Sequence, residues 1–416
     1  MFKEGIHVFI IVAGMAAIAA GRVPGLRVNR ASIALIVAVA LIVSGAIPLD
    51  AAYRAVDLGT IVLLFSMMIL VASLRISGLF DLVAARLSGL AGSPATFLAA
   101  IVAAAGVLSA LFLNDTMCLV LGPVVAETCI RARRDPVPYL VATATAANVG
   151  SAATIIGNPQ NMLIGATSGI PFTQFVLRAG PPAMLGLLAC WLVIVTVFPK
   201  EFGSRARRIV AARNAASVAP LGTSVIDRHM ARKSLIASAA MLAGFLAGVP
   251  VAIAALVPAA FLLWSRRVES DRLLSGVDFN LLVFFCGLFI ITAAAARTVA
   301  FTVLSRTILA DVAASPWKFS AVTAVISNII SNVPAVMVLS PSAAATADPG
   351  SAWLVLALAS TFAGNLTLLG SVANLIVAEG AASRGVKLGF LSYLTAGVPI
   401  TVATIAIGTF WLGLTA

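Results

Sequence analysis

Four clusters of polar residues interrupt the long apolar stretches of this chain, and they hold the residue types best suited to chemistry. The clusters combine Asn, Thr and Ser with Gly and Pro, which allow a helix to unwind and supply neutral oxygens and amides. A helix that unwinds in an apolar environment frees backbone carbonyls, which can ligate a cation, and creates helix N-termini, whose amides attract an anion. Any one of these side chains could instead only tie two helices together, but four clusters at related positions favour binding. The residues that we expect to bind a substrate or an ion are Asn114, Asp115, Thr116, Asn148, Thr154, Gly157, Asn158, Asn161, Ser331, Asn332, Asn365, Thr367, Gly370 and Asn374.

Asp115 is the most informative of these residues, because it is the only one of 15 acidic residues that we place deep in an apolar stretch. Asp57 and Asp278 open apolar segments, where helix capping explains them. Glu127 lies one turn before Arg131, a spacing that favours a surface ion pair. A buried carboxylate without a cationic neighbour is costly, so it is normally protonated, paired or bound to a cation. We therefore expect Asp115 to take up a proton or Na+, and the alternative is a helix cap at a wet mouth.

The composition places most of the chain in contact with lipid or with other apolar helices. Hydrophobic residues make up 61% of the 416 residues and charged residues only 10%, against about 25% in soluble domains. A soluble enzyme is therefore excluded. The formal net charge of +12 does not indicate nucleic acid, because aromatic residues are few and the basic residues are scattered between apolar blocks. The four cysteines lie inside apolar runs and are predicted to be small buried hydrophobes rather than disulfides or metal ligands.

The apolar stretches predict an all-α polytopic membrane protein. A spanning helix needs about 20 apolar residues. Two stretches, 94–131 and 317–347, are too long for one crossing and carry polar breaks near their middles, so we predict re-entrant hairpins. The first stretch is taken as a span, although Ala17-Ile18-Ala19 resembles a signal-peptidase site. The predicted spans are 6–21, 31–48, 57–75, 138–168, 175–198, 232–248, 250–265, 277–296, 352–381 and 389–414.

Two of these spans, 138–168 and 352–381, hold the remaining polar clusters and are predicted to be broken helices. Thr154, Gly157 and Asn161 recur in the second of them, in the same order and with the same spacing, as Thr367, Gly370 and Asn374. We therefore predict two repeats, 1–199 and 232–416, joined by a basic cytoplasmic linker over 200–231. Each repeat crosses the membrane five times, and an odd number of crossings requires the second repeat to be inverted. Inverted repeats with broken helices are typical of secondary transporters.

The basic residues predict the orientation of the chain. With these spans, all but six of the 27 lysines and arginines fall on one side, which is therefore cytoplasmic. Both termini are then extracytoplasmic, and the protein is predicted to lie in the inner membrane. The six basic residues on the other side are Lys3, Arg54, Arg178, Arg297, Arg306 and Lys318.

The polar clusters also resemble a known family. The segments 148–161, 327–334 and 364–374 are similar to those of the ion transporter superfamily, which holds arsenical-pump permeases, NhaD-type Na+/H+ antiporters and divalent anion/sodium symporters. The similarity is greatest to the arsenical-permease, NhaD and anion-permease branch, and it covers nearly the whole chain. The resemblance implies a scaffold, formed by the first three spans of each half, and a transport unit that moves against it in alternating access.

The two hairpin tips depart from the symporter pattern, in which both tips carry Ser-Asn-Thr. Here the first tip is Asn114-Asp115-Thr116 and the second is Ser331-Asn332-Val333. This difference argues against dicarboxylate recognition and against two equal sodium sites. An Asn-Asp tip is similar to that of the arsenical permeases.

These features predict a secondary active transporter of a small anion or oxyanion, arsenite-like or otherwise, coupled to an ion gradient. The alternative is a Na+/H+ antiporter of the same fold. No enzyme is predicted, because the motifs of membrane-embedded proteases and metal-dependent transferases are absent from the sequence. No cofactor is expected beyond Na+ or H+ as the coupling ion. The expected partners are the small ion and the lipid bilayer, and the symporter branch implies a homodimer. A cytoplasmic ATPase could dock on the basic face, and nucleic acid is not a partner.

Overall fold

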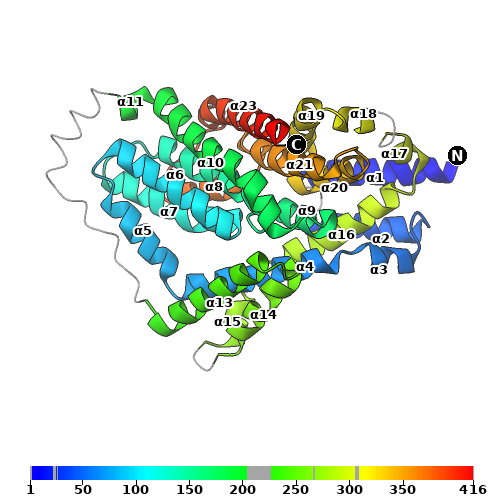
Figure 1. The fold of residues 1–416 in the computed structure, drawn as a ribbon, viewed down its shortest axis with the longest axis horizontal. Helices are drawn as coiled ribbons and strands as arrows, with labels where there is room; N and C mark the ends of the chain where they lie inside the picture. The colour runs from blue at the N-terminus through cyan, green and yellow to red at the C-terminus, as the bar shows by residue number, and fades with distance from the viewer. Residues whose placement is uncertain are drawn as a thin grey trace.

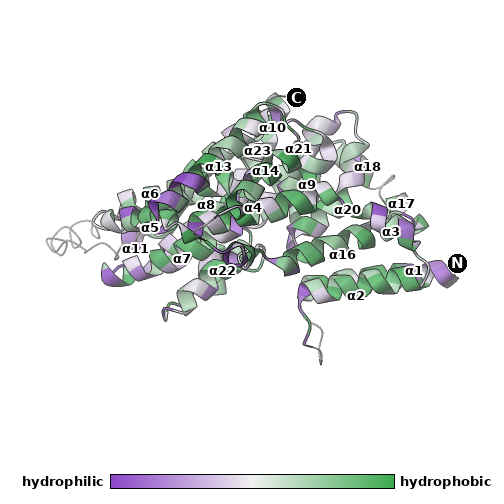
Figure 2. Cartoon of the chain, turned by 90° about the horizontal axis from the view of Figure 1, so that it is seen from below, coloured by the Kyte–Doolittle hydropathy of each residue, from purple (hydrophilic) through white to green (hydrophobic). Residues whose placement is uncertain are grey.

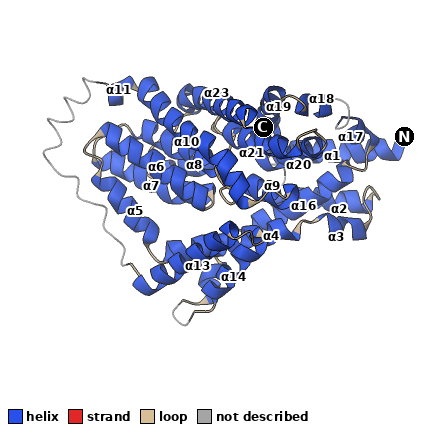
Figure 3. Ribbon diagram, in the orientation of Figure 1, coloured by secondary structure: helices blue, strands red, loops and turns tan. Residues whose placement is uncertain are grey.

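A computed structural model describes residues 2–21, 25, 27–203, 226–265, 268–304 and 309–415. Within these ranges the chain forms helices and connecting loops, with no strand (Figure 3). The predicted all-α fold is therefore confirmed for the described residues. Most of the predicted 200–231 linker lies outside the described residues.

The first half begins with three long apolar helices and continues with a hairpin and an interrupted helix. Short helices follow the second and third of the long ones. The elements are α1 (Phe2–Ala20), α2 (Arg30–Val43), α3 (Leu49–Ala55), α4 (Leu58–Ile76), α5 (Leu79–Gly89), α6 (Pro94–Leu111), α7 (Asn114–Arg131), α8 (Pro136–Ser151), α9 (Pro159–Ser168), α10 (Phe172–Val197) and α11 (Pro199–Phe202).

The second half follows the same order of long helices, short helices, hairpin and interrupted helix. Its elements are α13 (Arg228–Leu246), α14 (Val251–Leu263), α15 (Ser270–Leu274), α16 (Phe279–Ala295), α17 (Val299–Val303), α18 (Leu309–Ala313), α19 (Pro316–Ile330), α20 (Asn332–Ala344), α21 (Pro349–Ala363), α22 (Val372–Ala382) and α23 (Phe390–Leu414).

Several helix ends differ from the predicted spans by a few residues, and two of the differences have a clear physical cause. The predicted span 31–48 ends as a helix at Val43, because Gly45 takes a left-handed conformation (φ +78°) that ends the helix. The break in the first hairpin falls at Phe112 and Leu113, which have extended backbones, rather than at Asn114 and Asp115. Asn114 and Asp115 instead open α7, so their side chains sit at a helix N-terminus, which favours negative charge.

The two halves pack through one another rather than side by side. In the scaffold, α2 of the first half packs on α16 of the second, and α14 of the second packs on α4 of the first. Among the hairpins and broken helices, α7 packs on α22 and α9 packs on α20. Figure 1 shows the N-terminal helices α1 and α2 beside the yellow-green α16, far along the chain. The polar clusters of both halves are thereby brought to the middle of the molecule.

The apolar surface fits a membrane. Five helices among the described residues are long and apolar enough to cross a bilayer: Lys3–Ala20, Leu58–Ile76, Pro94–Leu111, Phe172–Val197 and Phe390–Leu414. Shorter apolar helices, such as Phe279–Ala295, accompany them. Figure 2 shows hydrophobic residues along most helices and hydrophilic ones gathered mainly at helix ends and connections.

Candidate functional site

The first broken helix is held open by a buried asparagine. The chain leaves the α-helix after Ser151 and resumes it at Pro159. Asn161 Nδ2 donates to the carbonyl oxygens of Thr154 (3.0 Å) and Ser151 (3.3 Å), which the break has freed from helical bonding. Gly157 fits because a Cβ there would lie 2.2 Å from the Ser151 carbonyl oxygen. The polar interruption is thus satisfied within the protein, as a break inside a membrane requires.

The second broken helix repeats this arrangement. The helix ends at Ala363 and resumes at Val372. Asn374 Nδ2 donates to the carbonyl oxygens of Thr367 (3.1 Å) and Gly364 (2.7 Å). In the repeat, Asn374, Thr367 and Gly364 correspond to Asn161, Thr154 and Ser151. The two breaks therefore share one set of contacts.

Asn148 joins the two broken helices to the tip of the first hairpin. Its Nδ2 donates to Asn365 Oδ1 (2.9 Å) and Asn374 Oδ1 (3.0 Å). Its Oδ1 accepts from Asn114 Nδ2 (2.9 Å) and from the Ser371 hydroxyl (3.2 Å). In addition, the Asn114 backbone amide donates to the Gly157 carbonyl oxygen (3.0 Å). The first tip is therefore fixed by hydrogen bonds to the first broken helix, which Asn148 in turn links to the second.

Thr361 occupies the position in the second half that corresponds to Asn148. Its hydroxyl donates to Asn161 Oδ1 (3.5 Å). The same hydroxyl accepts from Asn158 Nδ2 and Gln160 Nε2 (both 3.3 Å). In the first broken helix, the Thr154 hydroxyl donates a hydrogen bond to the Ala110 carbonyl oxygen of the first hairpin (2.5 Å).

The orientation of the amides follows from this network. Asn374 must turn its Nδ2 toward two backbone carbonyls, which accept only, so its Oδ1 accepts from Asn148. Asn148 Oδ1 must then accept from Asn114 Nδ2, which leaves the buried Asn114 Oδ1 without a partner. Asn332 Oδ1 in the second tip is also buried without a partner. Each tip therefore offers one unpaired carbonyl oxygen.

Two adjoining cavities meet at the first tip. A cavity of about 460 Å³ is lined by Asn114 and Asp115 from the first tip and by Ser331, Asn332 and Val333 from the second. A cavity of about 610 Å³ is lined by Asp115 and Thr116. Asp115 thus faces both cavities, and no side-chain hydrogen bond or ion pair reaches it from the described part of the chain.

The predicted site residues therefore fall into two groups. The tip residues Asn114, Asp115, Thr116, Ser331 and Asn332 line one or both cavities. The remaining ones form the hydrogen-bonded frame behind the tips, outside the linings of these two cavities. They are Asn148, Thr154, Gly157, Asn158, Asn161, Asn365, Thr367, Gly370 and Asn374.

Sequence reasoning missed the charged residues that the rest of the fold brings to these cavities. Arg30, Asp278 and Glu379 line the smaller cavity, and Arg75, Arg272 and Asp278 line the larger one. Because membrane orientation and helix capping already account for charged residues at helix ends, their positions in the sequence did not mark them as site residues. Asp278 does cap α16, since its Oδ1 accepts from the Leu281 backbone amide (3.1 Å), but it also faces the cavities.

The backbone of the second tip is strained. Ser331 has φ +79° and ψ 157°, a region that residues with a Cβ rarely adopt. Such conformations cost about 1–3 kcal/mol and occur mainly at functional sites. The first tip has no residue with a positive φ, because Phe112 and Leu113 are extended.

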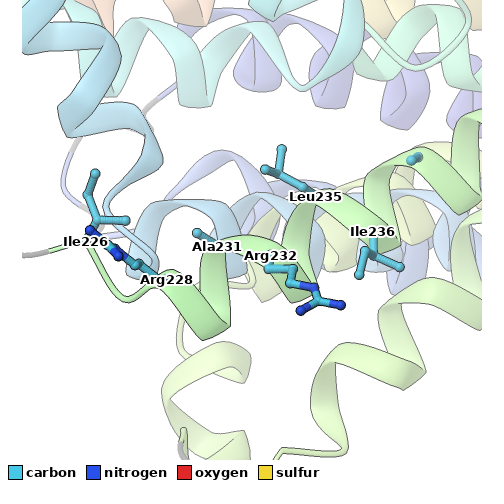
Figure 4. A pocket seen from close by; sticks show the side chains of 7 residues that line it. Ile226, Arg228, Ala231, Arg232, Leu235 and Ile236 are labelled. Atoms are coloured by element: carbon cyan, nitrogen blue, oxygen red, sulfur yellow. The ribbon is translucent and has the colours of Figure 1, made fainter.

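A further hollow, of about 480 Å³, lies along α13, away from the hairpin tips (Figure 4). Arg228 and Arg232 line it beside the apolar Leu235 and Ile236. No other described element contributes to this lining, so polar groups from different parts of the fold do not converge there.

Two smaller predictions are settled by the side chains. Cys118, Cys129 and Cys190 are buried and Cys286 is half-buried, and all four are free thiols. The predicted surface ion pair is present, with Arg131 Nε 2.7 Å from Glu127 Oε1.

Broken helices and hairpin tips that meet at shared cavities define the class of secondary transporters. Comparison with known proteins agrees. A model of the family described as citrate transporter (CitMHS) matches residues 8–363 of this chain. The chain therefore belongs to the citrate transporter family, within the predicted ion transporter superfamily, and its relatives are named as transporters rather than enzymes.

Similar proteins align over nearly the whole chain. The silicon efflux transporter LSI3 of Oryza sativa is 30% identical, covering 94% of both chains. An uncharacterized transporter of Mycobacterium tuberculosis is 30% identical over 93% of this chain and 94% of its own length. A transporter named arsB from Dictyostelium discoideum is 26% identical over 92% of this chain and 87% of its own. The YdaH transporter of Alcanivorax borkumensis shares the fold, with a TM-score of 0.51 at 16% identity over 99% of this chain and 98% of that one.

Proposed function

We propose that this protein moves a small anion or oxyanion across the membrane by alternating access, coupled to an ion gradient through Asp115. The observation that carries the proposal is the position of Asp115 between the two cavities. It stands at a helix N-terminus, beside an unpaired amide oxygen and without a cationic partner in the described residues. A carboxylate in that setting takes up a proton or a cation.

Three arginines support an anionic substrate. Arg75 and Arg272 line the larger cavity and Arg30 lines the smaller one. None of the three forms an ion pair within 4.0 Å in the described part of the chain. Guanidinium groups in a concave site raise the local concentration of anions and can bind carboxylates or oxyanions bidentately.

The substrate class is taken from the site and from the names of relatives. The family is described by citrate, one relative by silicon efflux and another as arsB. Citrate, silicic acid and arsenite share hydroxyl or carboxyl oxygens that neutral amides and arginines can bind. We therefore propose a hydroxylated oxyacid or a small carboxylate as the substrate.

Substitution Asp115→Asn tests the coupling, because it keeps the shape of the side chain and removes its charge. Gradient-driven uptake of citrate, silicate or arsenite into proteoliposomes should fall to the background rate, while the folded protein stays monodisperse. The matched control is Glu127→Gln in the same helix, whose carboxylate pairs with Arg131 at the surface and whose loss should leave uptake unchanged. Undiminished uptake by Asp115→Asn would refute the coupling role.

A Na+/H+ antiporter is the second candidate, because Asp115 shares its cavities with Asp278 and Glu379. Two or more carboxylates in one chamber favour cation exchange as well as anion transport. Collapse of a pH gradient on adding Na+, with no transported anion present, would support this candidate over the first.

In this proposal the protein lies in the inner membrane with both termini outside, so that both cavities lie on the cytoplasmic side of the hairpin tips. The hairpins and broken helices move against the scaffold helices α1, α2, α4, α13, α14 and α16. Two copies of the chain form a homodimer, as the resemblance implies. A cytoplasmic ATPase partner is not needed when an ion gradient supplies the driving force.

A further inference from the structure

Asp278 belongs to the scaffold, yet it lies where the moving hairpin ends. Its Oδ1 accepts from the Leu281 amide and caps α16, which packs on α2 in the scaffold. The same residue lines both cavities together with Asp115 of the first hairpin tip. The two carboxylates thus border the same two cavities from opposite halves of the chain.

The related residue in the first half behaves differently. Asp57 caps α4 in the same way, its Oδ1 accepting from the Thr60 amide (3.1 Å), but it lines neither of the two cavities. The two capping aspartates are therefore equal in their local structure and unequal in what they face. Capping alone explains Asp57, whereas it does not explain why Asp278 lines both cavities with Asp115.

The charged groups around this pair leave room for a cation. Arg30 of α2, Arg75 of α4, Arg272 of α15 and Glu379 of α22 also line the cavities, and the buried thiol of Cys118 lies one turn further along α7. None of these arginines is within 4.0 Å of either aspartate among the described ion pairs. Two carboxylates that line one cavity without such a partner are stabilised when a cation or a proton lies between them.

A second, independent observation points to the same ligand. Asn114 is only 4% exposed, lines the smaller cavity with both aspartates, and has an unpaired Oδ1. Its Nδ2 is committed to Asn148, so the carbonyl oxygen cannot exchange places with the amide nitrogen. A buried carbonyl oxygen without a donor is costly. A cation, or a proton held on a neighbouring carboxyl, would satisfy it.

We propose that Asp278, Asp115 and Asn114 together bind one monovalent cation, so that the coupling ion bridges the scaffold and the hairpin tip. This inference rests on the proposed function and adds a scaffold residue, Asp278, to the ion site proposed at Asp115. The ligand is either an alkali-metal ion coordinated by these oxygens or a proton shared between the carboxylates. Bound, it removes the repulsion between the two aspartates and lets the tip stay beside the scaffold. Released, it leaves two like charges that drive the tip away, which ties movement to the ion.

Substitution Asp278→Asn tests this site without removing the helix cap, because Asn caps a helix as well as Asp does. The matched control is Asp57→Asn. Binding of radioactive Na+ to the purified full-length chain, with competition by Li+ and K+, measures the alkali-metal form. The infrared carbonyl band of a protonated carboxyl, followed across neutral pH, measures the proton form. Asp278→Ser, which also keeps a cap, replaces the Asn variant if the latter does not fold.

We expect the loss of Asp278 to weaken Na+ binding by about tenfold or more, or to abolish the protonated-carboxyl band, and Asp57→Asn to leave both readouts as in the wild type. Loss of Na+ binding identifies the alkali-metal ion, and loss of the band identifies the proton. Wild-type behaviour of Asp278→Asn in both assays would overturn the inference, as would the absence of both signals from the wild type. Because these assays need no transport, the Asp115→Asn uptake experiment can succeed or fail separately.

Discussion

The two hairpin tips meet at one cavity but are built in opposite ways. The first tip carries the charge of Asp115 on a relaxed backbone, and Asn148 fixes the side-chain amide of Asn114 by a hydrogen bond. The second tip carries no charge and its backbone is strained at Ser331, although each tip has one unpaired asparagine oxygen. Two helix breaks with the same contacts, one in each half of the chain, therefore support tips with different chemistry. The difference indicates that the first tip handles the coupling ion and the second shapes the space for the substrate.

Alanine at the two break glycines should give the largest and most unequal effects. A Cβ at Gly157 would lie 2.2 Å from the Ser151 carbonyl oxygen, whereas at Gly370 its nearest neighbour is the side-chain oxygen of Asn328 at 2.9 Å. Backbone cannot move aside, so Gly157→Ala should cost about 3 kcal/mol or more and greatly lower the folded yield. Gly370→Ala should cost about half as much. Fluorescence-detected gel filtration with thermal challenge measures both, and equal losses would show that the two breaks are equally rigid.

Removal of the Asn148 side chain should be the next largest effect. Asn148→Ala leaves Asn114 Nδ2 and the oxygens of Asn365 and Asn374 without this partner. Each buried polar group left unpaired costs about 1–3 kcal/mol, so several kcal/mol should be lost. Thr361→Ala, the related change in the second half, removes longer bonds of 3.3–3.5 Å and should cost less. Melting temperatures in one detergent decide between them. A larger loss at Thr361 would contradict the view that the first tip is the more firmly held.

Glycine at the strained tip should stabilise the protein. Ser331→Gly permits φ +79° without a Cβ clash and should gain up to about 1 kcal/mol. Ser331→Ala is the matched control, because it removes the hydroxyl but keeps the strain, and it should give no gain. If the strain helps the tip to move, transport by Ser331→Gly will slow while its melting temperature rises. A lower melting temperature for the glycine variant would show that the strain is absent in solution.

The smallest expected effect lies at the caps of the two broken helices. Asp135 caps α8, and Asp348, its counterpart in the second half, caps α21 by accepting from the Ser351 amide (3.1 Å). The hydrogen bonds from Ser351 lower the pKa of Asp348 below its ordinary value of 3.8. A lowered pKa adds stability that is present above pH 3.8 and is lost as the pH falls through and below that value.

Asp348→Asn keeps a cap that does not titrate, so it isolates the pH-dependent stability that the Asp348 carboxylate contributes. Relative to the wild type, the variant should be slightly less stable near neutral pH, by a few tenths of a kcal/mol. The difference in melting temperature should shrink as the pH falls toward 4 and below. A difference that grows in acid would mean that the sign of this linkage is wrong.

The positions of the breaks could be predicted because Gly, Pro and Asn change local backbone preferences wherever they occur. Gly157 and Pro159 mark the first interruption, and Gly370 marks the second. The exact break in the first hairpin was missed, because Phe112 and Leu113 have no local reason to leave a helix. They do so because the Asn114 amide bonds to the Gly157 carbonyl, a contact that only the folded chain supplies.

The charged lining of the cavities could not be predicted for a similar reason. Asp278 and Arg75 stand at helix ends, where capping and membrane orientation already account for them. Their place beside Asp115 in one cavity depends on how α4 and the start of α16 border the hairpin tip, and for Asp278 it joins opposite halves of the chain.

From the sequence alone follow the membrane character of this chain, the approximate course of its helices and the interruptions of the two broken spans. Those properties follow from hydrophobicity and backbone preference, which act within a few turns of the chain. The folded structure is needed to know which polar groups come together: which amide oxygens stay unpaired, which arginines border the cavities and which of two capping aspartates lines them with Asp115. Those depend on the packing of one half through the other, and no local preference encodes a distance between residues so far apart along the chain.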